Sequence, residues 1–127
     1  TAANVGVELS LGRARIAYIP GAAMVTPAMM TRLARASAIF FDGTLFRDDE
    51  MIVGGAGTKS GRRMGHMPVG GADGTLAALA GIACRRVLVH INNTNPILVD
   101  GSPARMEVER MGWEVAEDGM EITLDAT

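Results

Sequence analysis

The chain has 127 residues, 48% of them hydrophobic and 20% charged, so it can bury enough apolar surface to form one domain and is not a disordered tail. Its twelve Lys and Arg against fourteen Asp and Glu give a net charge of -2, and only 4% of the residues are aromatic, which together argue against a nucleic-acid partner. No apolar run approaches the roughly 18 residues that span a bilayer, and the single cysteine, Cys84, has no internal disulfide partner. We therefore expect no membrane partner and a reducing, cytoplasmic location.

The N-terminal third of the sequence predicts a hairpin, a helix and a buried strand. Alternating apolar residues on either side of a glycine turn predict a hairpin over residues 5–19. Thr26-Pro27 is typical of a helix start, and the helix should run to about Arg35. The continuous apolar run 38–41 predicts a short strand of the kind found in a sheet that is covered on both faces.

The segment from about 43 to 74 differs in kind, because it holds nine of the sixteen glycines. It predicts a long loop, and loops of this length in compact domains are usually functional lids or binding loops, or else disordered. Beyond it, the sequence predicts a short helix, a second buried strand, another helix and a closing hairpin. These elements span residues 75–80, 86–91, 103–111, and 113–116 with 120–124. The alternation of strand, helix and strand predicts parallel pairing and an α/β (α+β) fold.

Two predicted strands end in side chains that bind metals or move protons. Asp42 follows the first buried strand, and His90 ends the second. Because ligands of open α/β sheets sit outside the carboxyl ends of the strands, both groups should lie at the functional edge. With His66 from the intervening loop they would supply two or three ligands of a metal site. The alternative is that Asp42 only opens an Asp-Gly turn and that His90 is a satisfied core histidine.

Polar groups for a substrate occur in two places. Asn92, Asn93 and Asn95 follow His90 closely, and their amides are suited to bonding a substrate or orienting an imidazole; an Asx-rich turn is the simpler interpretation. Arg62 and Arg63 are suited to a substrate carboxylate, which a guanidinium matches in geometry. A solvated basic turn is the alternative for that pair.

Four motifs, in order, carry a family resemblance. They are FFDGTLFRDDEM (40–51), TKSGRRMGHM (58–67), HINNTNP (90–96), and GWEVA with DGME (112–116 and 118–121). With them the chain resembles the C-terminal part of the coenzyme PQQ synthesis protein B family, in the metallo-β-lactamase-fold superfamily. The resemblance implies the C-terminal half of an αββα sandwich, so that residues 1–127 form a single, partial domain. Its implied partner is the N-terminal half of the same fold, which carries the main ligand cluster.

The resemblance also implies a site and a function. Asp42 falls at the superfamily's bridging carboxylate and His90 at its last histidine ligand, while His66 matches a histidine that acts near the metal as a catalytic group. The family is implied to serve pyrroloquinoline quinone (PQQ) biosynthesis as an iron-dependent hydroxylase of a tyrosine-containing, peptide-derived precursor. A non-catalytic carrier of PQQ or its precursor and a metal-dependent hydrolase are the alternatives. The expected cofactor is iron or zinc, and the fragment alone is expected to be inactive.

Overall fold

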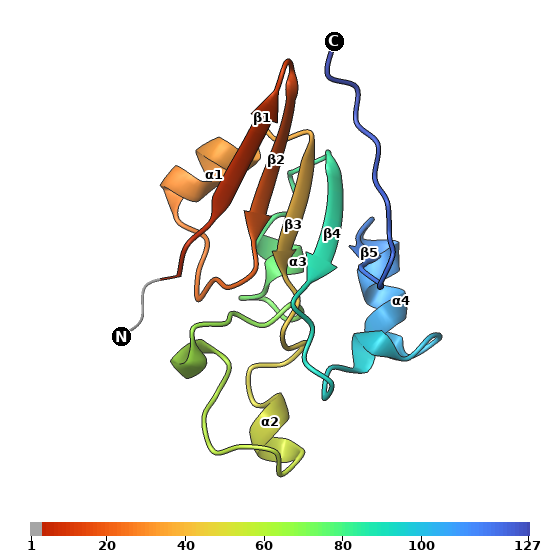
Figure 1. Cartoon of the computed structure of the whole chain (residues 1–127). Coiled ribbons are helices and arrows are strands. Elements are labelled where there is room, and N and C mark those ends of the chain that lie inside the picture. The colour runs from red at the N-terminus through yellow and green to blue at the C-terminus, as the bar shows by residue number, and fades with distance from the viewer. Residues whose placement is uncertain (1–3) are drawn as a thin grey trace.

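The computed structural model describes residues 4–127 and is built on one five-stranded sheet, in the order β1-β2-β3-β4-β5 (Figure 1). The strands are β1 (Val7–Leu11), β2 (Ala14–Ile19), β3 (Ala38–Asp42), β4 (Arg85–Val89) and β5 (Glu114–Val115). β1 and β2 pair antiparallel, and β2 to β5 pair parallel. The predicted N-terminal hairpin, the parallel crossovers and the α/β class are therefore confirmed.

Short helices connect the strands. They are α1 (Pro27–Leu33), α2 (Glu50–Val53), α3 (Thr75–Ala78) and α4 (Pro103–Arg110), with the 3-10 turns η1 (Arg62–Met64) and η2 (Pro96–Leu98). The hydroxyl of Thr26 accepts a hydrogen bond from the Met29 amide at 3.2 Å and caps α1, as its position before Pro27 predicted. Among residues 4–127, no helix has the length and apolar character needed to cross a membrane.

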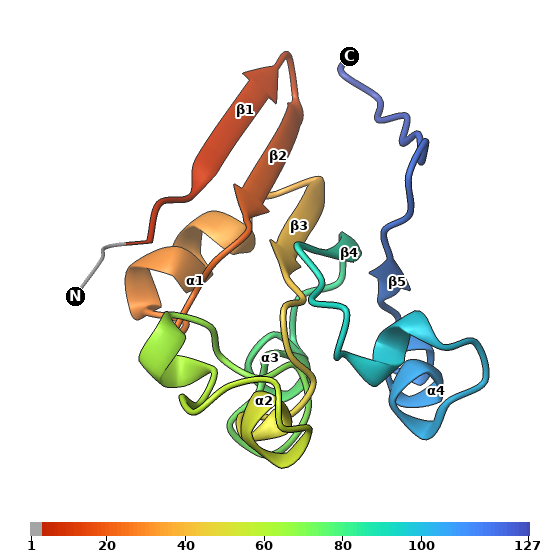
Figure 2. The ribbon, with the colours of Figure 1, turned by 60° about the horizontal axis from the view of Figure 1, so that its bottom comes forward.

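The hydrophobic core lies between the sheet and the helices. Ile39 and Phe41 of β3 and Leu88 of β4 point to this side and are fully buried. They pack in one cluster with Leu33 of α1, Leu76 of α3 and Val108 of α4. Leu79, the residue that directly follows α3, belongs to the same cluster. Burying each such side chain is worth about 1.5–3 kcal/mol. This packing fixes β3 and β4 side by side, so their carboxyl ends are held in one place (Figure 2).

The other face of the N-terminal hairpin is open. Alternation along β1 and its register with β2 place Val7, Leu9, Leu11 and Tyr18 on one side. These side chains are 46%, 57%, 75% and 42% exposed. Among residues 4–127, the helices lie on the opposite side of the sheet (Figure 2), so the apolar surface here lacks the second layer that a sandwich would supply.

The predicted closing hairpin is wrong. Only Glu114–Val115 forms a strand, and it pairs parallel with β4. The segment 120–124 forms none. Its apolar residues are half-buried and its polar residues exposed, which is the alternation that suggested a strand. The segment instead runs on to the turn of the β1–β2 hairpin, where Ala126 O accepts a hydrogen bond from Arg13 N at 3.2 Å (Figure 1).

Several element boundaries differ from the predicted ones by a few residues. The first helix ends at Leu33 rather than Arg35, the helix from residue 75 ends at Ala78, and the strand predicted over 86–91 spans Arg85–Val89. The glycine-rich segment 43–74 is mostly loop, but it contains α2 and η1. Its course is fixed by backbone hydrogen bonds, among them Gly61 N to Asp48 O at 2.8 Å and Val69 N to Leu45 O at 2.9 Å.

Candidate metal centre

Asp42 and His90 meet at the carboxyl end of the sheet. Asp42 is the last residue of β3 and is paired in register with Val89, the last residue of β4, so His90 begins the loop directly beside it. One potential ligand atom from each of Asp42, His66 and His90 lies within 4.8 Å of the others. The convergence that the sequence predicted for the two strand ends is therefore present, and His66 joins it.

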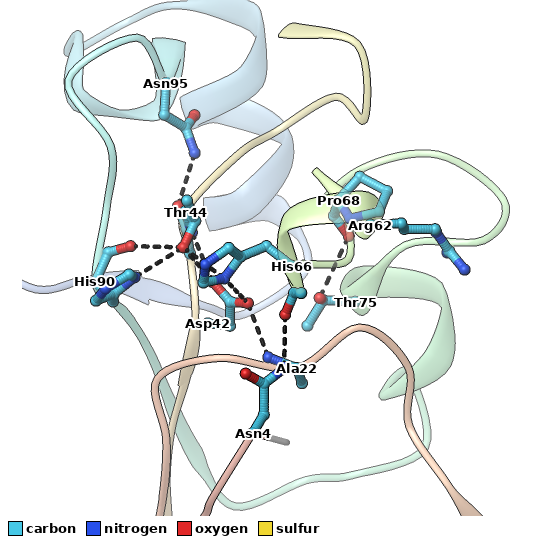
Figure 3. A network of polar contacts seen from close by, with 12 residues as sticks. Asn4, Ala22, Asp42, Thr44, Arg62, His66, Pro68, Thr75, His90 and Asn95 are labelled. Carbon is cyan, nitrogen blue, oxygen red and sulfur yellow. Dashed lines mark hydrogen bonds and ion pairs between the residues drawn. The ribbon is translucent and has the colours of Figure 1, made fainter. Parts of the chain in front are cut away.

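His66 reaches the site because the glycine-rich segment turns back over the strand ends. Gly65 has a φ of 89°, a left-handed conformation that glycine adopts without strain. The His66 amide bonds Gly61 O at 2.8 Å, and the next amide, of Met67, bonds Ala22 O at 2.6 Å. These bonds attach the loop to the turn after β2 and leave the His66 side chain 18% exposed above Asp42 (Figure 3).

Asp42 is fully buried and accepts four hydrogen bonds. Its Oδ1 accepts from the Thr44 amide at 3.0 Å and from the Thr44 hydroxyl at 2.6 Å. Its Oδ2 accepts from the Ala22 amide at 3.0 Å and faces His66 Nδ1 at 2.7 Å. Each oxygen thus has one backbone donor, which is fixed, and one side-chain partner, which can move. Such bonds compensate a buried carboxylate for its lost hydration.

His90 adopts a strained conformation to face this cluster. Its φ of 56° is the one positive value of a non-glycine residue among residues 4–127. Positive φ disfavours residues that carry a Cβ, and such strain concentrates at functional sites. The His90 ring stacks on the His66 ring, with centroids 5.3 Å apart and planes 20° apart. The backbone therefore holds the two imidazoles face to face.

Thr44 is the residue of this site that the sequence analysis missed. Its hydroxyl oxygen lies 2.6 Å from Asp42 Oδ1, 2.8 Å from His90 Nδ1 and 3.1 Å from His66 Nδ1 (Figure 3). The Asp-Gly-Thr spacing indicates a local turn, and the Thr44 amide does bond the Asp42 side chain. Nothing in the sequence indicates that the hydroxyl also meets two histidines from distant segments.

The three asparagines have different surroundings. Asn95 is 2% exposed, and both ends of its amide bond backbone: Nδ2 donates to Gly43 O at 2.8 Å, and Oδ1 accepts from Ile97 N at 3.0 Å. Asn92 is half-buried and donates from Nδ2 to the Thr94 hydroxyl at 2.7 Å, while Asn93 is exposed. Asn95 therefore holds the loop in place, and Asn92 and Asn93 are the two nearer to solvent.

Arg62 and Arg63 lie in η1 and are exposed. The Arg62 guanidinium donates to Asp73 O at 2.7 Å and so connects two parts of the glycine-rich segment. Figure 3 shows this side chain directed away from His66. An interaction of Arg62 with a substrate at the histidines would require the side chain to leave Asp73.

An open groove of about 610 Å³ begins at the same edge of the sheet. Its lining includes Gly21 and Ala22, and a Cβ added at Gly21 would lie 3.5 Å from Cε1 of His66. Apolar side chains, among them Ile19 and Leu33, form much of its wall. The groove thus offers an apolar surface that starts beside the polar cluster.

Cys84 lies far from this chemistry, since it precedes β4 and His90 follows the other end of that strand. Burial raises the pKa of its thiol, and the charge of Arg86 only partly opposes the effect. The thiol is therefore protonated at neutral pH and is not an activated nucleophile.

The side chains at the cluster suit a transition metal. Two imidazoles and one carboxylate on neighbouring elements are the ligand types that zinc and non-haem iron take, with coordination positions left over. The two backbone donors of Asp42 would hold its carboxylate in place beside a bound ion. The residues present thus fit a metal ion, as the strand-end pattern predicted.

This chain is similar in sequence and in structure to known proteins. Coenzyme PQQ synthesis protein B of Methylobacterium radiotolerans is 53% identical over 125 residues, covering 98% of this chain and 42% of the relative. The Ruegeria pomeroyi protein of the same name is 54% identical over 121 residues, covering 95% and 41%. The crystal structure of Zn²⁺-bound PqqB from Methylobacterium extorquens matches with a TM-score of 0.92 and 50% identity, covering 98% of this chain and 45% of that one.

This chain thus spans less than half the length of the relatives that it matches. The family model of the beta-lactamase superfamily domain matches residues 1–91, which is more than half of the chain. The sheet with helices on one face, the TM-score and this match agree with one another. The chain therefore belongs to the beta-lactamase superfamily.

Proposed function

We propose that this chain contributes Asp42, His66 and His90 to the metal centre of a longer protein that serves PQQ biosynthesis. The observation that carries the proposal is the convergence of these three side chains within 4.8 Å. The names of the relatives supply the pathway, and the Zn²⁺-bound structure of the similar Methylobacterium extorquens protein supports a metal at this fold. Residues 1–127 would then be one part of a larger domain.

Asp42 is the proposed bridging carboxylate. Each of its oxygens is fixed by one backbone amide, from Thr44 or Ala22. Each keeps one further acceptor position, which in this structure faces Thr44 Oγ1 or His66 Nδ1. A carboxylate fixed in this way would serve as a ligand shared between metal ions.

His90 is the proposed histidine ligand, and His66 the proposed proton-transfer group. His66 holds its Nδ1 against Asp42 Oδ2 at 2.7 Å, so its other nitrogen is left for a substrate proton. His90 is exposed and held by its strained backbone at the strand end. In this assignment Asp42 and His90 bind the ion, and His66 gives or takes a proton beside it.

Iron in such a site, when bound, would supply open coordination positions for O₂ and substrate. We propose iron-dependent hydroxylation of a tyrosine-containing precursor as the reaction of the full-length protein, and zinc as the other candidate metal. The aromatic part of the precursor would lie in the groove that begins at Gly21 and Ala22. Arg62, Arg63, Asn92 and Asn93 would contact its carboxylates from the loops around the site, with Asn95 fixing the loop.

The partner proposed for the open face of β1 and β2 is the N-terminal half of the same fold. That face exposes Leu9 and Leu11 by 57% and 75%, and a second sheet packed on it would remove this apolar surface from water. We propose a cytoplasmic location, because the lone Cys84 is unsuited to an internal disulfide.

Two alternative functions would use the groove or the metal cluster beside it. A non-catalytic carrier would hold PQQ or its precursor in the groove without turnover, and the apolar lining of the groove favours this candidate. A di-metal hydrolase would use Asp42 between two ions to activate water. Metal analysis combined with oxygen consumption on a tyrosine-containing substrate separates hydroxylase from carrier.

The proposal is tested by expressing residues 1–127 alone and together with the N-terminal half of a PqqB relative. We expect weak metal retention after dialysis and no turnover for the chain alone, because missing ligands remove both bonds and the constraint on the others. Addition of the second half should raise metal content and activity. Tight, stoichiometric metal and full turnover in a monomer of the short chain would contradict the partial-domain proposal.

A further inference from the structure

The hydroxyl of Thr44 has several hydrogen-bond partners within reach, but it can donate its one proton to only one of them. Besides its contacts with Asp42 Oδ1 at 2.6 Å and His90 Nδ1 at 2.8 Å, it lies 3.0 Å from the carbonyl oxygen of His90. Thr44 is only 8% exposed, so water does not readily replace these partners. A hydroxyl has one proton to donate and two lone pairs that accept. The arrangement therefore restricts where the neighbouring protons lie.

The carboxylate and the carbonyl only accept hydrogen bonds. If the hydroxyl proton pointed to His90 Nδ1, Thr44 Oγ1 and Asp42 Oδ1 would face each other at 2.6 Å with no proton between them, so the hydroxyl donates to the carboxylate. His90 Nδ1 at 2.8 Å then faces a lone pair of Thr44 Oγ1 and bonds it only if Nδ1 carries a proton. In a neutral imidazole the other nitrogen, Nε2, is then without one.

The same reasoning applies to His66, but through a different residue. Its Nδ1 lies 2.7 Å from Asp42 Oδ2 and 3.1 Å from Thr44 Oγ1. Because the carboxylate oxygen only accepts, His66 Nδ1 also carries a proton. Asp42 therefore fixes the proton of His66, while Thr44 fixes that of His90.

We propose that Thr44 is a positioning residue that sets the tautomer and orientation of His90, so that Nε2 is the nitrogen offered to a metal. The functional half of this inference rests on the proposed metal centre. Histidine ligands commonly donate their second ring N–H to an oxygen, which fixes the ring and strengthens it as a ligand. Here the oxygen is a threonine hydroxyl, which is itself fixed by the bridging carboxylate.

The test is ¹⁵N NMR of histidine-labelled, metal-free chain at about pH 9, where unperturbed imidazoles are neutral. Solid-state spectra make the measurement independent of self-association. The variants are Thr44→Val, which removes the hydroxyl at constant shape, and Thr44→Ser, which keeps it. Thr75→Val is the matched control, because Thr75 is a buried threonine like Thr44, but its hydroxyl contacts Pro68 O at 3.4 Å, away from the histidines.

In the wild type we expect both rings to carry the proton on Nδ1. In Thr44→Val the His90 ring should shift toward the Nε2–H form that imidazole prefers in water, while His66 keeps its tautomer because Asp42 is unchanged. Thr44→Ser and Thr75→Val should match the wild type. A wild-type His90 with the proton on Nε2, or an unchanged His90 in a folded Thr44→Val, would overturn the proposal. If Thr44→Val does not fold, the wild-type and Thr44→Ser spectra still decide, since both must show Nδ1–H.

Zinc titration of the same samples separates this inference from the proposed function. Loss of such an oriented partner typically weakens metal binding about 10–100-fold, and we expect a loss of that size for Thr44→Val with recovery in Thr44→Ser. If no variant binds zinc at this site, the metal proposal fails, and the tautomer spectra still decide the role of Thr44. A zinc affinity that is equal in the wild type and folded Thr44→Val would contradict the positioning role.

Discussion

His66 Nδ1 lies 2.7 Å from Asp42 Oδ2, although the two residues are 24 positions apart and belong to a loop and a buried strand. This contact joins the glycine-rich segment to the end of β3. It contributes to the geometry of the candidate site, because Asp42 is fully buried and is held by four hydrogen-bond donors, of which His66 is one.

Replacing Asp42 by Asn should destabilise the fold. The amide has the same shape, but its NH₂ group would face a backbone N–H, from Thr44 or Ala22, in place of an accepting oxygen. Leaving such a buried donor unsatisfied costs about 1–3 kcal/mol. Urea denaturation should show this loss, with Asp100→Asn as the control because that side chain is 96% exposed. Equal stability of the two variants would mean that Asp42 is not held as described.

His66→Ala in a complete protein should lower turnover, because the proposed proton-transfer group is lost. The fold should persist, since the side chain is partly exposed and its loop is held by backbone bonds. The measurements are metal content and turnover, with Lys59→Ala as the control in the same glycine-rich segment. If both quantities stay at the wild-type level in His66→Ala, the proposed role of His66 is wrong.

The open face of the hairpin should cause self-association of the chain. Leu9 and Leu11 are 57% and 75% exposed next to other apolar side chains, and extended patches of this kind are rare on monomeric proteins. Light scattering should show that Leu9→Lys reduces the associated fraction. Val53→Lys should not, because Val53 is 77% exposed on α2, away from this face. A wild-type chain that stays monomeric at high concentration would refute this expectation.

Part of the site was predictable because simple rules apply to it. Apolar runs before Asp42 and His90 indicated two buried strands, and parallel strands bring their carboxyl ends together. His66 was a candidate third ligand because it lies in the intervening loop, but its position could not be predicted, since a loop of this length has no periodic pattern to fix its course. Thr44 was not predictable from spacing, because its role depends on contacts with His66 and His90 from two other segments.

The C-terminal segment shows the opposite case, in which a clear pattern led to a wrong pairing. Alternation over 120–124 is real, but alternation alone does not identify the neighbouring strand. The segment follows a turn in which Met120 N bonds Glu117 O at 3.1 Å, and it ends against Arg13 at the first hairpin. Sequence reasoning favoured the nearest strand as partner, whereas the tertiary structure supplies a distant contact.

The stability contributed by β5 should depend weakly on pH. Glu114 receives two hydrogen bonds from the Arg85 guanidinium, at 2.8 and 2.9 Å, and these lower the pKa of its carboxyl below the ordinary 4.5. A lowered folded-state pKa stabilises the fold above pH 4.5, and this contribution is lost as the pH falls through the folded-state value.

Glu114→Gln should therefore reduce the melting temperature by a few degrees at most near neutral pH, because the pair is solvent-exposed. The difference from the wild type should vanish in strong acid. Melting curves of both proteins across this range check the prediction. A difference that grows as the pH falls would contradict the assigned sign.

In the proposed site, Asp42 and His90 bind a metal ion and His66 lies beside it. Zinc titration followed through the ring ¹⁵N signals of both histidines tests this arrangement most directly. This measurement detects weak binding and assigns it to residues. We expect the His66 and His90 signals to change together with a single midpoint, and Asp42→Asn to raise that midpoint strongly, while Asp100→Asn leaves it unchanged. Histidine signals that change at separate midpoints, or do not change up to millimolar zinc, would contradict the claim.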